Sequence, residues 1–333
     1  MNPSQRSTTT ALWSLASSRA IQIFAAATIL ALALAFLLGV QGVPFHRPAV
    51  PTAEIAPNLF IQIVQILIAL VIITVALWIT RRRSAVDFDA RTPETPIAKR
   101  ETFGLLAYGA VVLVIGSLFG IGLHLHGAVF GPTQEIVPSE VYIWAAYNFL
   151  SFAVVPYLLF RSQGYGHRAL CLKSNNIKND AILIVTVLLV ESAVELVTFP
   201  DLFALTTSQL LIGMPVTLIL HLLGTGLPVM IFVYALLFPR YMKLTGSASA
   251  AVVLGALTYA GLHIFEYWTV YDSLRHGVLS VLFVFLQFAF PGLIKSVLTL
   301  RTGNAWVHLW AYHVIAPHVT VDTPLVVRTF GIR

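Results

Sequence analysis

Long apolar runs separated by short polar segments dominate the pattern of this chain. Runs of about 18 or more apolar residues can cross roughly 30 Å of hydrocarbon as helices, and they lack the alternation of barrel strands. The pattern therefore predicts an all-α, polytopic integral membrane protein. We expect about nine transmembrane helices, near 20–40, 59–80, 103–124, 141–160, 181–199, 209–238, 248–266, 278–297 and 304–318.

The composition supports the same class. Hydrophobic residues make up 58% of the chain and charged residues 10%, whereas soluble domains carry roughly 25% charged residues. The first partner expected is therefore the lipid bilayer. The net charge of +6 is spread over short loops rather than gathered in one patch, which argues against nucleic acid. The single cysteine, Cys171, excludes an internal disulfide framework.

The basic residues also predict an orientation. With a cytoplasmic N-terminus, 16 of the 20 Lys and Arg residues fall in inside segments, as the positive-inside rule requires. The C-terminus is then extracytoplasmic. Short loops and the lack of a targeting peptide favour a bacterial inner (cytoplasmic) membrane. The four basic residues on the outside are Arg47, Arg275, Arg328 and Arg333.

A polar segment with two prolines, 81–101, is the best internal boundary. It divides the chain into a two-helix N-terminal unit with a basic cytoplasmic loop (1–100) and a seven-helix bundle (101–318). An extracytoplasmic tail follows (319–333). The Thr, Pro and Arg content of this tail favours a surface strand or a disordered end.

Ionisable side chains inside the spans are the candidates for chemistry, because each costs on the order of 2.5–3.5 kcal/mol to insert. Glu191 and Glu195 lie four residues apart and so share one face of the fifth span. His221 is at a similar depth on the sixth, where it could contact Glu191. Such a contact could be a structural hydrogen bond, a proton relay or part of a substrate site. Gly224, Gly226 and Pro228 predict a kink or an unwound turn in the sixth span.

His263 and Glu266 are three residues apart and can also share a face. Two imidazoles on separate helices and a carboxylate would make a zinc triad with water in the fourth position. His308 and His313 are five residues apart, about 140° around an α-helix, so they are not expected to face one ion. We interpret His308 and His318 as edge residues near the membrane surface.

Three short segments carry a family resemblance. They are Tyr259-Ala-Gly-Leu-His263, the Leu236-Leu-Phe-Pro-Arg240 stretch, and Arg301-Thr-Gly-Asn-Ala-Trp306 followed by His313. Together, over about 209–318, they resemble the CPBP family of CAAX-protease and bacteriocin-processing intramembrane metallo-endopeptidases. The resemblance implies metal ligation by His263 and His313, with zinc or another divalent metal as the cofactor of an active enzyme.

The chain departs from the family pattern at two motifs. Where the family has Glu-Glu-x-x-x-Arg, this chain has Val229, Met230 and Tyr234, and Pro317 stands where an asparagine is expected. A hydrolase needs a group that takes a proton from water and returns it to the leaving amine. The candidate replacements for the missing base are Glu266, Glu191 and Glu195.

Three functions follow. The loss of the acidic motif favours a divergent, noncatalytic member that acts as an immunity, partner or assembly factor on a membrane peptide or protein. The alternative is an active intramembrane metallopeptidase with a rearranged general base. The second alternative is a transporter that uses the broken sixth helix with Glu191, Glu195 and His221.

Overall fold

The computed structural model describes residues 17–46, 50, 52–124 and 136–333, and every regular element in these ranges is helical. The all-α expectation is confirmed, while Arg47 lies outside the described residues. The α-helices are α2 (Arg19–Gly39), α3 (Ile55–Ile79), α4 (Thr95–Leu118), α5 (Pro138–Asn148), α6 (Val155–Ser162), α7 (Ile177–Thr198), α8 (Thr207–His221), α9 (Leu227–Val229), α10 (Phe238–Thr245), α11 (Ala248–Gly261), α12 (Leu274–Thr302), α13 (Ala305–His308) and α14 (Val321–Thr329).

Shorter turns join or interrupt these helices. Two are 3-10 turns, η2 (Asp89–Arg91) and η4 (Pro200–Ala204). The others are π-helical, with five-residue hydrogen-bond spacing: η3 (Phe149–Val154), η5 (Leu222–Gly226), η6 (Met230–Leu237), η7 (Leu309–His313) and η8 (Ile315–Thr320). The disturbance expected near Gly224 and Pro228 therefore takes the form of π-helical turns within one continuous helical run.

Seven continuous helical runs in the described part of the chain are long and apolar enough to cross a bilayer. Their outer faces carry large apolar side chains, such as Leu118 and Val197, which are 77% and 84% exposed. Such faces are unfavourable in water and suited to lipid. The fold is therefore that of a multi-pass membrane protein.

The count of nine spans is not confirmed. The seventh expected span is the 14-residue helix α11, which is shorter than a membrane-crossing helix. The ninth is divided at Val314 between η7 and η8. The expected strand or disordered end in 319–333 is wrong, because α14 forms there and buries Asp322 and Thr323.

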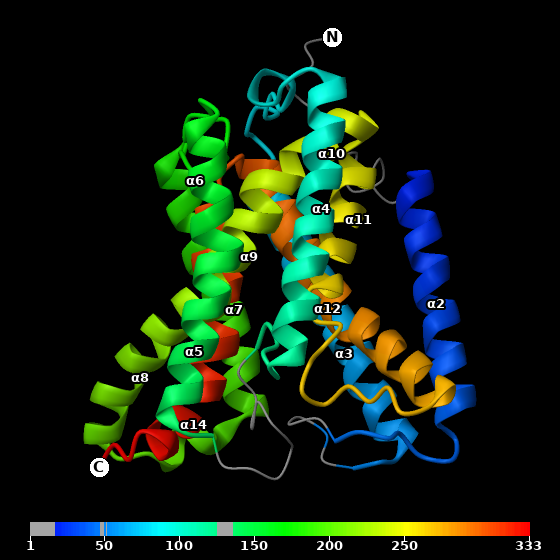
Figure 1. Cartoon of the computed structure of the whole chain (residues 1–333), viewed down its shortest axis with the longest axis vertical. Helices are drawn as coiled ribbons and strands as arrows, with labels where there is room; N and C mark the ends of the chain where they lie inside the picture. Colours follow the sequence, from blue (N-terminus) through cyan, green and yellow to red (C-terminus); the bar gives the residue numbers. More distant parts are fainter. Residues whose placement is uncertain (1–16, 47–49, 51, 125–135) are drawn as a thin grey trace.

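Two helical runs form the centre of the bundle. In the 39-residue run 207–245, 67% of the residues in an apolar 18-residue stretch are buried. The corresponding buried share is 61% in α12 and 22% in α2. In Figure 1, α2 and α3 lie on the α12 side of the molecule, and α8 and α14 lie together at the opposite lower corner. α11 packs along α12.

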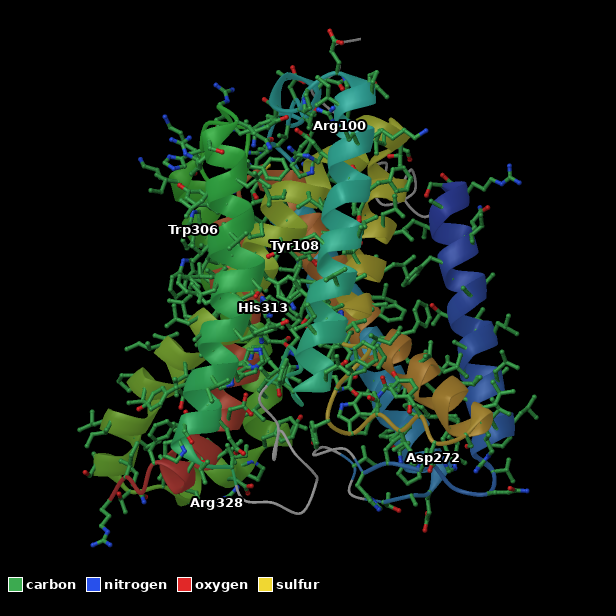
Figure 2. The ribbon with its side chains drawn as sticks, viewed as in Figure 1. Arg100, Tyr108, Asp272, Trp306, His313 and Arg328 are labelled. Atoms are coloured by element: carbon green, nitrogen blue, oxygen red, sulfur yellow. The ribbon has the colours of Figure 1, made fainter. Side chains whose placement is uncertain are left out.

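Two of the 16 basic residues counted in the inside segments, Arg240 and Lys295, have buried side chains. Arg240 is 1% exposed, and its Nε atom donates to Glu101 at 2.8 Å. Lys295 is also 1% exposed, because α12 continues seven residues past it. Figure 2 shows the contrast between charged residues towards the ends, such as Arg100 and Arg328, and His313 among the helices.

Candidate metal centre

A π-helical segment places three histidines along one face. His308, His313 and His318 follow one another at intervals of five residues, and their rings are successively 6.1 and 5.8 Å apart. Backbone bonds from Val314 to Leu309 and from Val319 to Val314 show the i→i+5 spacing. Residues five apart come close together in a π-helix but not in an α-helix.

This geometry corrects two expectations about the last helical segment. His308 and His313 were expected to diverge, but the wide turns bring their rings onto one side. His308 and His318 were interpreted as edge residues, but they are 0% and 3% exposed in the interior of the bundle. π-Helical turns of this kind are frequently found at functional sites.

His263 lies in the turn just after α11, with its ring orientation set by its own backbone. Its Nδ1 atom lies 2.7 Å from the carbonyl oxygen of Tyr259. A carbonyl only accepts hydrogen bonds, so Nδ1 carries the proton and Nε2 keeps its lone pair. The Nε2 atom lies 3.3 Å from Nε2 of His124. The tautomer with its proton on Nδ1 is the one that a histidine bound to a metal through Nε2 requires.

His124 follows α4 and meets both partners of this site. Its Nε2 atom faces His263, and its Nδ1 atom lies 3.6 Å from Oε1 of Glu266. The three residues each offer a ligand atom within 4.8 Å of those of the others. The expected His263 and Glu266 pair is therefore brought together, with an imidazole that the sequence analysis did not select.

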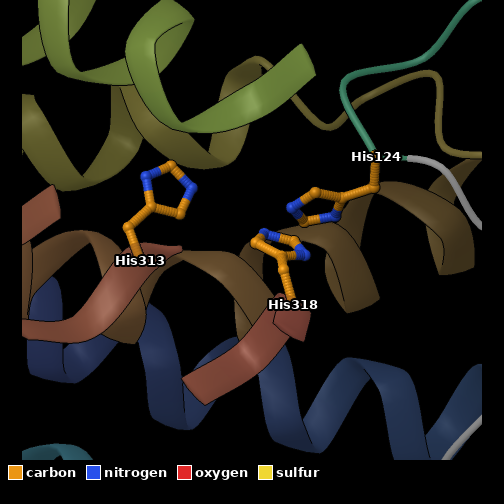
Figure 3. Close-up of side chains that lie close together, drawn as sticks. All are labelled: His124, His313 and His318. Carbon is orange, nitrogen blue, oxygen red and sulfur yellow. The ribbon is translucent and has the colours of Figure 1, made fainter. Parts of the chain in front are cut away.

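A second group joins His124 to the π-helical segment. Ligand atoms of His124, His313 and His318 also lie within 4.8 Å of one another. Figure 3 shows the three rings converging, His124 from one side and the two others from successive turns of the same helical segment. His124 thus belongs to both groups, and it connects His263 and Glu266 with His313 and His318.

Behind His318 lies a carboxylate that orients it. Oδ2 of Asp322 is 3.1 Å from Nδ1 of His318 and 3.0 Å from Nε2 of His221. Nδ1 of His221 donates to the carbonyl of Thr217 at 3.0 Å. The expected contact between Glu191 and His221 is not found in the described structure, where the carboxylate beside His221 belongs to Asp322.

A cavity of about 210 Å³ opens beside this cluster. Its polar lining includes His124, His313 and His318, both Glu191 and Glu195 from α7, and Lys295 from α12. The Lys295 ammonium lies 3.5 Å from the centre of the Tyr259 ring. All three carboxylates expected as bases are therefore at or beside the cluster: Glu266 contacts His124, and the α7 pair reaches the same cavity.

The donor set fits a transition metal such as zinc. Two Nε2 atoms bound to one tetrahedral zinc at about 2.0–2.1 Å would lie about 3.3–3.4 Å apart, and those of His124 and His263 lie 3.3 Å apart. The Nδ1 atom of His263 contacts a carbonyl, and the Nδ1 atom of His318 contacts a carboxylate. These are the acceptors that usually orient ligating histidines. Neither nitrogen of His313 has a hydrogen-bond partner among the described residues.

Three members of the site were not expected from the sequence. His124 stood at the expected end of a span, beside a second histidine at 126, and that doubled histidine was the available signal. Asp322 was assigned to a tail, although it follows His318 by one helical turn. Lys295 was assigned to the inner end of a span rather than to its interior.

Comparisons with protein families, curated proteins and solved structures found no match for this chain.

Proposed function

We propose that this protein is an intramembrane metal-dependent hydrolase, and specifically a metallo-endopeptidase of the kind that the sequence resemblance implies. The observation that carries the proposal is the contact of His124 with both Nε2 of His263 and the carboxylate of Glu266. This contact supplies a carboxylate next to paired imidazoles, which the sequence lacked at the position of the family's acidic motif.

Four imidazoles are the candidate ligands, those of His124, His263, His313 and His318, and the Glu266 carboxylate lies beside them. A divalent metal bound there would polarise a carbonyl and lower the pKa of a bound water. The chain's own contribution is to hold the imidazoles in the ligating tautomer and to limit access of bulk water, since His263 and His313 are at most 1% exposed.

A carboxylate at the site has to move the proton in peptide hydrolysis. The oxygen of water adds to the peptide carbonyl carbon, the C–N bond breaks, and the water proton is passed to the leaving nitrogen. We assign this transfer to Glu266, because it contacts His124 at 3.6 Å. Glu191, Glu195 and Lys295 line the neighbouring cavity, where the Lys295 Nζ atom could donate a hydrogen bond to an oxyanion.

The test is a comparison of membrane peptides from cells that express the wild-type chain, Glu266→Gln or the control His276→Ala. His276 bonds Asp272 at 2.5 Å at the N-terminal end of α12, outside the cluster. We expect cleavage products in the wild type and the control, and a loss of about 10²-fold or more in Glu266→Gln. Identical peptide profiles in all three would support the noncatalytic partner or assembly role instead.

We also infer a cytoplasmic N-terminus and an extracytoplasmic C-terminus in a bacterial inner membrane. The distribution of Lys and Arg supports this orientation. A reporter enzyme that is active only outside the cytoplasm, fused after Arg333, is expected to be active. Activity only from a cytoplasmic reporter at the same position would reverse the orientation.

A further inference from the structure

A second polar pocket lies away from the histidine cluster, at the helix ends where the segment after α3, the loop before α7 and the end of α12 meet. We call it the arginine pocket. It has a volume of about 770 Å³, and its charged lining residues are Arg82, Arg83, Arg91, Arg168 and Asp87. Four cations and one anion line it, and the proposed hydrolase uses none of them.

Arg91 is the unusual member, because it is a buried cation held by neutral groups. Arg91 is 6% exposed. Its Nη1 atom donates to the carbonyl of Gly303 at 2.7 Å and to Sγ of Cys171 at 3.4 Å. Gly303 has φ +60°, and a Cβ there would lie 2.8 Å from both terminal nitrogens of Arg91. The backbone is thus shaped to admit this guanidinium.

None of these contacts neutralises the charge of Arg91. Burial raises the pKa of the Cys171 thiol, so the sulfur is uncharged near neutral pH. In the part of the chain that the structure describes, no carboxylate forms an ion pair with Arg91. Buried charges are normally paired, because an isolated ion loses its hydration without compensation.

The neighbouring charges leave a positive surplus in the pocket. Arg83 is paired with Asp180, so its charge is balanced. Asp87 accepts a hydrogen bond from the backbone of Ala90 and is exposed. Arg82 and Arg168 are exposed and line the same space. An anion in the pocket would therefore meet Arg91 at its wall and two further guanidinium groups at its mouth.

We propose that the arginine pocket binds a phosphoryl-bearing anion through Arg82, Arg91 and Arg168. The planar guanidinium group pairs with phosphate oxygens by two parallel hydrogen bonds, and phosphate is therefore the anion that clustered arginines suit best. The pocket lies where α3 and α12 end, and both helices are long and apolar enough to cross a bilayer. Their placement across a bilayer would bring the pocket to the region of the lipid phosphates. The same chemistry serves a phospholipid headgroup or a soluble phosphate.

The experiment uses the full-length chain purified in detergent and two probes. Native mass spectrometry measures retention of dioleoyl phosphatidylglycerol, and equilibrium dialysis measures binding of labelled inorganic phosphate. The pocket variant is Arg82→Gln with Arg168→Gln, both exposed and so compatible with folding. The control is Arg81→Gln with Arg100→Gln, which removes equal charge from exposed residues outside the pocket lining.

We expect at least one probe to bind the wild type and the control, and to bind the pocket variant about tenfold more weakly. Binding of the lipid alone identifies a headgroup site, and binding of inorganic phosphate identifies a soluble ligand. The proposal is overturned if neither probe binds, or if pocket variant and control bind equally. Zinc content and peptide cleavage are expected to be unchanged in both variants, so failure here is separate from failure of the proposed hydrolase.

Discussion

The Oδ2 atom of Asp322 lies 3.1 Å from Nδ1 of His318 and holds that ring in place. The Nε2 atom of His318 is then left as its ligand atom. A carboxylate in this position orients a ligating imidazole and raises its basicity. It comes from α14, beyond the last segment expected to span the membrane.

Asp322→Asn is therefore expected to weaken zinc binding about 10–100-fold, as replacement of such orienting groups usually does. The affinity is measured by competition with a chelating dye. Asp272→Asn is the matched control, since Asp272 bonds His276 outside the cluster. Equal affinities for the two variants would show that Asp322 does not act on a metal ligand.

Close packing of α11 against α12 predicts a large effect from a small substitution. A Cβ at Gly292 would lie 2.7 Å from Cα of Ala256 and 2.9 Å from its carbonyl oxygen. Gly292→Ala is expected to cost about 1–3 kcal/mol by overpacking, seen as a lower midpoint of thermal unfolding in detergent. Gly104→Ala in α4 meets no atom within 4 Å and is expected to raise the midpoint slightly. A higher midpoint for Gly292→Ala would contradict this helix contact.

Tyr165 makes the stability of the fold depend on pH in the alkaline range. Burial, and then its 2.6 Å hydrogen bond to Glu101, raise the pKa of Tyr165 to about 12 from an ordinary value of 10.0. Below pH 10.0 the phenol is protonated in both folded and unfolded chains, so its contribution is fully present. Between pH 10.0 and about 12 the unfolded chain releases this proton first, and stability falls.

The measurement is the thermal midpoint of the wild type and of Tyr165→Phe from pH 9 to about 12. Other alkaline titrations are common to both chains, so the difference reports Tyr165. We expect the wild type to lose stability more steeply than the variant over this range. Parallel curves would mean that the hydroxyl does not titrate differently in the folded state.

The sequence was sufficient for the membrane class because long apolar runs have a direct physical meaning. It also singled out the His263 and Glu266 pair, whose spacing fits one helical face. The pair in fact lies in the turn after Gly261, where α11 ends. The residues came together as expected, but through a turn rather than through helical periodicity.

The rest of the site depends on features that periodicity does not reveal. The alignment of His308, His313 and His318 depends on π-helical turns, which are rare and are not indicated by an apolar pattern with the α-helical period. Lys295 looked like a loop charge because it stood near the end of an apolar run. In the fold, the Tyr259 ring and the cavity provide its surroundings.

Metal analysis of the detergent-purified chain shows whether the histidine cluster binds a metal ion. We expect about one equivalent of zinc or another transition metal in the wild type and in His276→Ala. His124→Ala and His263→Ala are expected to lose most of it, because their Nε2 atoms form the 3.3 Å pair at the centre of the cluster. A metal-free wild type after zinc addition, or unchanged metal content in both variants, would show that the cluster is not a metal site.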